Sequence, residues 1–105
     1  MKKMRLSEAI REGGKHFKQG RGYMLYIFND SPRVCALGAA YYATFGTLPK
    51  MFAISSEDLW DAYPELLKEF PGYEHHNLQS LIMKWNDNDG RTFDEIADRI
   101  AAKGY

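Results

Sequence analysis

The stretch SPRVCALGAAYYATFG, residues Ser31–Gly46, carries no charged side chain between Val34 and Gly46. The polar residues 29–31 precede it as capping candidates, Pro32 suits a first helical position, and Gly46 suits a helix end. In a chain of 105 residues, an uncharged helix is shielded from water only at the centre of the fold. The stretch therefore predicts a central helix over about residues 32–45, around which the other elements pack.

Small residues predict that this central helix packs closely against its neighbours. Its small side holds Cys35, Ala36, Ala39, Ala40 and Ala43, and its bulky side holds Val34, Leu37, Tyr41 and Phe45. A helix over about residues 8–19, with Ser7 as N-cap, contains the adjacent glycines Gly13 and Gly14. Because each glycine weakens a helix by about 1 kcal/mol relative to alanine, the pair indicates a close approach by another element.

Three further helices follow from hydrophobic spacing and capping residues in the second half of the chain. Ser55 and Ser56 precede a helix that Pro64 breaks near Tyr63. Apolar residues then recur at helical spacing over 78–85 and over 93–100, and Thr92 and Glu95 form a capping box. We expect residues 1–105 to form one mainly α, compact five-helix domain.

Two short apolar segments are candidate strands. YMLYIF at Tyr23–Phe28 has no charge and is rich in β-forming residues, and KMFAI at Lys50–Ile54 is the second candidate. A strand needs a partner for its backbone groups. Either the two segments form a two-stranded element, 23–28 with 50–54, or residues 23–28 lie as an extended arm on the helices.

The charge is distributed unevenly although the net charge is zero. Residues 1–54 hold nine Lys/Arg and three Asp/Glu, whereas residues 55–105 hold five and eleven. We interpret the two halves as solvated faces of opposite charge. In the first half, Glu8 and Glu12 interrupt a basic stripe formed by Arg11, Lys15 and Lys18. The alternative is a nucleic-acid surface formed by Lys2, Lys3, Arg5, Arg11, Lys15, Lys18 and Arg21.

The single cysteine excludes an internal disulfide framework and suits a reducing compartment. The first residues lack the apolar run of a signal peptide, and the uncharged stretch is shorter than the ~20 apolar residues that cross a bilayer. We expect a cytoplasmic location and no membrane contact.

Cys35 is the one candidate nucleophile, since a thiol near a helix N-terminus can have a lowered pKa. His75 and His76 follow in the chain order of a Cys–His hydrolase or transferase. The alternative is a buried spacer among alanines. The DND sequence before Gly90 lacks the carboxylates that an EF-hand needs at its first and last positions, so we expect no metal and no cofactor.

The polar turn WNDNDG after the fourth helix is the most promising ligand or partner site. Its residues Trp85, Asn86 and Asp87 fix the angle between the last two helices, and short polar side chains there bond to nearby backbone. We also expect Asp87 to meet Arg33 or the open N–H groups that start the 32–45 helix.

CALGA at Cys35–Ala39, WND at Trp85–Asp87 and GRTFDEIADRI at Gly90–Ile100 resemble a family of small uncharacterised bacterial and phage proteins. KHFKQG at Lys15–Gly20 is similar to the family's entry segment, except that Phe17 stands where a Trp is expected. The resemblance implies a compact helical domain with a mobile-element origin, and it implies no activity.

We therefore expect a binding or interaction module, a monomer or homodimer, that engages a protein or a small molecule. An accessory role in a phage, directed at a host protein, is its sharpest form. The enzyme that depends on Cys35 and the nucleic-acid-binding protein are the alternatives.

Overall fold

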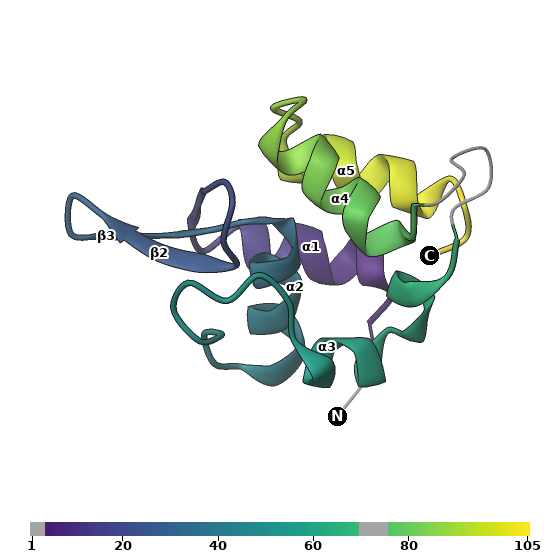
Figure 1. Ribbon diagram of the computed structural model, residues 1–105, viewed down its shortest axis with the longest axis horizontal. Coiled ribbons are helices and arrows are strands. Elements are labelled where there is room, and N and C mark those ends of the chain that lie inside the picture. The colour runs from purple at the N-terminus through teal and green to yellow at the C-terminus, as the bar shows by residue number, and fades with distance from the viewer. Residues whose placement is uncertain (1–3, 70–75) are drawn as a thin grey trace.

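The computed structural model describes residues 4–69 and 76–105, which form helices and a small sheet (Figure 1). The helices are α1 (Leu6–Gly14), α2 (Ala36–Phe45), α3 (Glu57–Ala62), η1 (Pro64–Leu67, a 3-10 helix), α4 (Leu78–Asp87) and α5 (Phe93–Ala101). The strands are β1 (Lys18–Gln19), β2 (Leu25–Phe28) and β3 (Ser31–Val34). The described part of the chain thus contains the five α-helices expected, together with a three-stranded sheet.

The central helix starts later than the sequence predicts. Residues 36–40 of α2 are all buried, as expected, but residues 31–34 form β3 instead of the first helical turn. Asn29 and Asp30 both have positive φ, 49° and 60°, which is the geometry of a two-residue hairpin turn between β2 and β3. Phe28 and Ser31 flank the turn, and Ile27 and Pro32 form the next pair of the ladder. At this second pair the antiparallel strands do not exchange N–H···O bonds, so proline, which lacks an N–H group, fits there.

The sheet has the order β1-β3-β2, so neither alternative for residues 23–28 is correct: residues 50–54 are not a strand of the sheet, and residues 25–28 pair with β3 instead of lying as an arm on the helices. β2 is antiparallel to β3, and β1 is parallel to β3. Residues 50–54 form a turn beside β2, where the Phe52 N–H donates to the Leu25 carbonyl at 2.8 Å. They do not continue as a strand because Phe52 has a φ of 63°, outside the β region.

The first helix differs from its prediction at both ends. Arg5 is the N-cap, and the predicted cap Ser7 lies inside α1, where its hydroxyl donates to the Tyr105 carbonyl at 3.2 Å. α1 ends at Gly14 instead of continuing to about residue 19. Lys18 and Gln19, which were expected to be its last residues, form β1 and pair in parallel with β3.

The close approach predicted from the small residues is confirmed. A Cβ atom added to Gly13 would lie 1.8 Å from the carbonyl oxygen of Ala39, so α1 and α2 meet backbone to backbone. A Cβ on Gly38 would lie 1.9 Å from the carbonyl oxygen of Met24. α2 is therefore packed tightly by α1 on one side and by the residues before β2 on another.

The later helices match their sequence signals. The Ser56 hydroxyl accepts from the Leu59 N–H at 3.4 Å, and α3 ends before Pro64 starts η1. In the capping box of α5, the Glu95 N–H donates to the Thr92 hydroxyl and the Thr92 N–H donates to the Glu95 carboxylate, both at 3.1 Å. α4 and α5 lie together on one side of the molecule, while the β2–β3 hairpin projects from its end (Figure 1).

The Cα radius of gyration is 12.5 Å, close to the ~13 Å typical of a compact domain of this size. Among the described residues, no helix has the length and apolar composition required to cross a membrane.

We predict that Gly13→Ala destabilises the protein, although alanine favours a helix over glycine. The new methyl group would overlap the Ala39 carbonyl, and relief requires α1 and α2 to move apart. We expect the free energy of unfolding in urea to fall by about 1–3 kcal/mol or more. Glu12→Ala, an exposed neighbour in the same helix, should change it by less than about 0.5 kcal/mol. Equal stability of the two variants would contradict the backbone contact.

Candidate functional site

The Asn86 side chain, 1% exposed, lies at the centre of a polar cluster at the end of α4. Its Oδ1 accepts from Gln19 Nε2 at 2.7 Å and from the Ala36 N–H at 3.1 Å. Its Nδ2 donates to the Gly20 carbonyl and to Asp87 Oδ1, both at 2.8 Å. All four hydrogen-bonding positions of the amide are therefore used. One side chain joins α4 to the start of α2, to β1 and to the segment that follows β1.

Asp87 extends this cluster toward the segment before β2. Its Oδ1 also accepts from the Gly22 N–H at 2.9 Å. Gly22 has a φ of 86°, a left-handed conformation that favours glycine, so the carboxylate holds a turn that other residues would adopt with strain. Gln19 Nε2 further donates to the Arg91 carbonyl at 2.7 Å, which ties β1 to the turn between α4 and α5.

The structure brings Asn86 and Asp87 together but does not assemble the predicted site. The N–H group at the start of α2 donates to Asn86 and not to Asp87. Apart from the hydrogen bond between Asn86 and Asp87, the partners of both side chains are distant in sequence instead of local. Arg33 lies on the hairpin with its guanidinium 5.1 Å from the centre of the Phe28 ring. Trp85 is 3% exposed and has Arg99 over its ring. This cluster is internally satisfied, so its evident role is to position the hairpin.

Cys35 is the N-cap residue of α2 and is 1% exposed. Burial raises the pKa of its thiol to about 11, and this outweighs the backbone N–H groups of Gly38 and Leu37, which lower it. At neutral pH the thiol is therefore protonated. His76 is exposed, and His75 lies outside the described residues. Over residues 4–69 and 76–105, no group of three or more His, Cys, Asp or Glu side chains is arranged to hold a metal ion.

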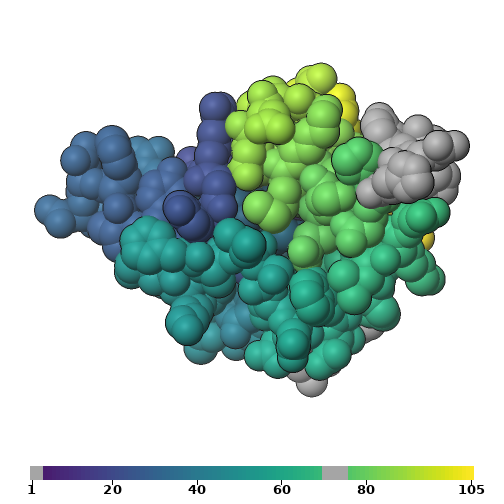
Figure 2. Space-filling model, viewed as in Figure 1, coloured from purple at the N-terminus to yellow at the C-terminus, as the bar shows by residue number. Residues whose placement is uncertain are grey.

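Exposed apolar side chains gather at the opposite end of the molecule from the C-terminus. The large apolar residues with the greatest exposure in the described chain are Tyr23, Ile27, Phe28, Leu48, Met51, Phe52, Ile54 and Leu67. Of these, Ile27 and Phe28 belong to β2, Tyr23 lies two residues before it, and all the others except Leu67 lie in the loop 48–54. Figure 2 shows this loop beside the projecting hairpin. We call the exposed and partly exposed side chains of 23–33 and 48–54, with Lys18 and Arg21 beside them, the hairpin surface.

The two parts of the hairpin surface are held together by direct contacts. The rings of Tyr23 and Phe52 meet edge to face with centres 5.4 Å apart. The Met24 N–H donates to the Ala53 carbonyl at 2.7 Å, which adds to the bond between Phe52 and Leu25. Loop and hairpin therefore present one continuous surface.

The strand register gives the hairpin two distinct faces, because alternate residues of a strand share a face and paired residues lie side by side. Leu25 and Val34 share the face that packs against Ala39 in α2. The other face carries Tyr26 opposite Arg33, with Phe28 beyond them. Lys18 of β1 lies beside Arg33 on this second face. The inner end of the hairpin is thus fixed to the core, and its second face combines aromatic rings with cations.

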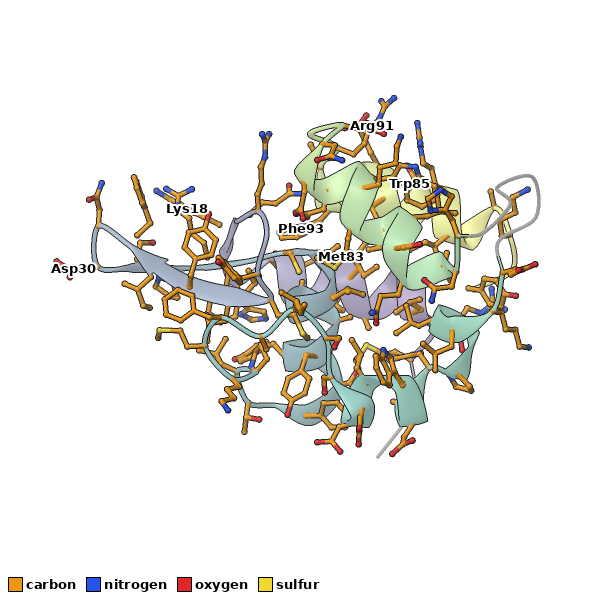
Figure 3. The ribbon with its side chains drawn as sticks, viewed as in Figure 1. Lys18, Asp30, Met83, Trp85, Arg91 and Phe93 are labelled. Carbon is orange, nitrogen blue, oxygen red and sulfur yellow. The ribbon has the colours of Figure 1, made fainter. Side chains whose placement is uncertain are left out.

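Positive charge surrounds this surface. Between Glu12 and Glu57, the only acidic residue is Asp30, at the outer end of the hairpin, and Figure 3 shows Lys18 between it and the helices. In the described chain, no carboxylate lies within ion-pair distance of the cations Lys18, Arg21, Arg33 and Lys50. Arg33 Nε is buried without a hydrogen-bond partner. By contrast, Arg11 pairs with Asp98, and Lys15 pairs with Glu12.

The backbone of the hairpin surface contains every non-glycine residue with positive φ in the described chain: Asn29, Asp30 and Phe52. Asn and Asp tolerate this conformation, but a bulky residue such as Phe rarely adopts it. Phe52 is also 60% exposed, the highest value among the large apolar residues. Strained conformations of this kind cluster at functional sites.

The hairpin surface was not predicted because residues 23–28 were expected either to pair with residues 50–54 or to lie as an arm on the helices, and residues 31–34 were expected to be helical, so no β2–β3 hairpin was foreseen. The signal that could have found it is the long interval without acidic residues between Glu12 and Asp30 and between Asp30 and Glu57. The cations within that interval have almost no acidic residue near them in sequence and stand among apolar residues. Charged residues without a partner are uncommon in a buried core, so this pattern indicates a surface.

We predict that Asn86→Ala lowers the free energy of unfolding by about 3 kcal/mol or more. The substitution leaves the Ala36 N–H and the Gly20 carbonyl buried without partners, at about 1–3 kcal/mol each. Asp87→Ala should cost less, about 1–3 kcal/mol, because Asp87 is only partly buried. Urea denaturation measures both, with the exposed Asn88→Ala as control. If Asn86→Ala unfolded at the same urea concentration as Asn88→Ala, the cluster would not have this role.

We predict that the Cys35 thiol reacts slowly with a thiol reagent at neutral pH, because it is buried and protonated. The unfolded thiol loses its proton near its ordinary value of 9.0, whereas the folded thiol keeps it up to about pH 11. The free energy of unfolding should therefore fall between these pH values more steeply than in Cys35→Ala. Rapid labelling of the native protein at neutral pH would contradict the burial and favour a nucleophilic role.

Comparison with known proteins places the chain in a family. The model of the family described as "Family of unknown function (DUF6197)" matches residues 6–102. No curated protein and no solved structure matches the chain. The matched residues include every helix and strand described above, from α1 to α5. The chain therefore belongs to the DUF6197 family, whose function is unknown.

Proposed function

We propose that this protein is a binding module that engages a partner protein through the hairpin surface. One observation carries the proposal: seven of the eight most exposed large apolar side chains of the described residues lie on the hairpin and the loop 48–54. Contiguous exposed apolar side chains on a soluble domain typically mark an interaction site. The surface projects from the helical body, where a partner has free access to it (Figures 1 and 2).

The residue types support a protein partner. Aromatic residues, Met and Arg are enriched in the cores of protein interfaces, and the hairpin surface contains Phe28, Phe52, Met51 and Arg33. Tyr and Arg are also frequent among the residues that carry most of the binding energy. Phe28 and Arg33 are in contact before any partner binds, so their ordering costs little at that step.

The alternatives from the sequence have weaker support. A nucleophilic role for Cys35 requires a thiolate, and burial of the thiol opposes it. For a small molecule, the described residues form several hollows. One of about 450 Å³ lies between residues 15–18 and the outer part of β3 and is lined by Lys15, His16, Phe17, Lys18, Ser31 and Pro32, and another of about 410 Å³ lies beside the end of α2. Both are open to solvent, whereas most ligand pockets enclose the greater part of their ligand.

A nucleic-acid surface along the basic first half is also less favoured. Arg11 and Lys15 are each paired with a carboxylate, Lys18 lies on a strand and not in one stripe with them, and Lys2 and Lys3 lie outside the described residues. Aromatic rings beside Lys18 and Arg33 nevertheless offer a stacking surface for a single strand. This is the second candidate function.

A cytoplasmic location agrees with the free and buried thiol of Cys35, which a reducing compartment preserves. The accessory role in a phage or other mobile element, with a host protein as partner, stays a prediction that rests on the family resemblance.

Site-specific photo-crosslinking tests the proposed function. A photoreactive phenylalanine analogue replaces Phe28 or Phe52 in the full chain, expressed in cells of its source, and a third protein carries it at Leu67. Leu67 is 50% exposed but lies on η1, away from the hairpin. We expect a discrete protein adduct from positions 28 and 52 and none from position 67.

Three other results would contradict the proposal. Equal adducts from position 67 would mean collisional labelling, and no adduct from positions 28 and 52 would mean that the surface has no protein partner. An adduct of twice the mass of the chain would identify a second copy as the occupant instead of a partner protein.

A further inference from the structure

We infer that the partner presents carboxylate side chains next to apolar ones, as an acidic and apolar segment of a protein. The inference rests on the proposed function and specifies the chemistry of the partner. It is carried by the cations of the hairpin surface, their spacing, and the apolar side chains that surround them.

The first observation is that Lys18 and Arg33 are neighbours in the sheet. Parallel pairing of β1 with β3 sets these two cations side by side on one face of the sheet. Like charges at paired positions of adjacent strands repel each other. No carboxylate of the described residues lies within ion-pair distance of either cation. A carboxylate from a partner, placed between them, would turn this repulsion into two attractive contacts.

The second observation is the position of the Arg33 guanidinium beside the Phe28 ring. The Phe28 ring lies 5.1 Å from it and orients it, and neither Nε nor the terminal nitrogens donate to any described residue. The planar guanidinium donates two parallel hydrogen bonds to a carboxylate, which makes it specific for such a group. The terminal nitrogens of Arg33, which are not buried as Nε is, are therefore the donors that a partner's carboxylate can reach.

The third observation is the hollow between residues 15–18 and the outer part of β3. Lys18 and Ser31 line it together with Pro32, and its volume of about 450 Å³ exceeds that of an acidic side chain. It adjoins the face that carries Arg33, so an acidic side chain can enter it while neighbouring apolar side chains of the partner cover Phe28.

The apolar residues distinguish a protein from a nucleic acid. Met51 and Ile54 are 44% and 59% exposed and offer aliphatic or thioether surface without a ring. Bases bind by stacking on aromatic side chains, so a single strand would leave these two residues unused. Apolar side chains of a protein partner would cover them.

The charge also argues against a second copy of the chain. A two-fold contact places the same surface on both sides, so Lys18, Arg21, Arg33 and Lys50 would face their own equivalents. Asp30 is the only acidic residue available to offset them. Complementary charge on a different protein avoids this cost.

The test is selection from a library of random peptides displayed on phage, with the immobilised full chain as bait. We expect the recovered sequences to be enriched in Asp and Glu next to apolar residues. A synthetic peptide of the recovered consensus should bind at least about tenfold more weakly to Arg33→Glu and to Lys18→Glu by fluorescence anisotropy. Lys68→Glu makes the same charge change away from the hairpin and should bind it as the native chain does.

One further variant of the chain and one variant of the peptide make the outcomes distinguishable. Phe52→Asn removes the most exposed ring with a residue that tolerates positive φ, so it probes the apolar surface without added strain. A peptide in which Lys replaces the acidic residues should bind Arg33→Glu better than the native chain. The urea midpoint of each variant must match that of the native chain, which removes misfolding as an explanation.

Each of the other outcomes would overturn either this inference or the proposed function. Peptides that need Phe52 but lack acidic enrichment would overturn this inference and leave the proposed function standing. Peptides whose binding ignores both Phe52 and Arg33, or no recovered peptide, would overturn the proposed function itself. Oligothymidine that binds through Arg33 and Phe52 more tightly than any recovered peptide would replace the protein partner with a single-stranded nucleic acid.

Discussion

The buried amide of Asn86 is the interaction on which the arrangement of this fold depends. A buried amide that lacks partners costs about 1–3 kcal/mol for each unsatisfied group, so its bonds strongly select one arrangement of the surrounding chain. Its partners belong to the start of α2, to β1 and to the segment after β1. The position of the hairpin relative to the helices follows from these bonds and from the contact of Gly38 with the backbone of Met24.

Fixing the inner end of the hairpin in this way leaves the outer end free for binding. Leu25 and Val34 are buried against α2, whereas Ile27 and Phe28, two and three residues further, are exposed. The loop 48–54 adds a second set of apolar side chains through its contacts with Tyr23 and Leu25. A rigid base and an exposed, partly strained end are what a preorganised binding surface requires.

The elements that sequence analysis predicted well are those whose signals are local. The periodicity of α4, the break at Pro64 and the capping box of Thr92 and Glu95 each act within about one helical turn. The elements that it predicted wrongly depend on pairing. Pro32 fits the first turn of a helix as well as it fits a strand position that needs no N–H group, and only the left-handed turn at Asn29 and Asp30 decides between them.

The sequence by itself determined the five helices, the close contact marked by Gly13, and the membership in a family. It also specified Asn86 and Asp87 as important polar residues, without their partners. Only the tertiary structure decided that Asn86 meets Ala36, that Lys18 lies beside Arg33, and that the apolar loop stays exposed. The physical reason is distance along the chain, because local preferences act over a few residues. Three of the four Asn86 hydrogen bonds join positions 50 to 67 residues apart, which come together only when the whole core has packed.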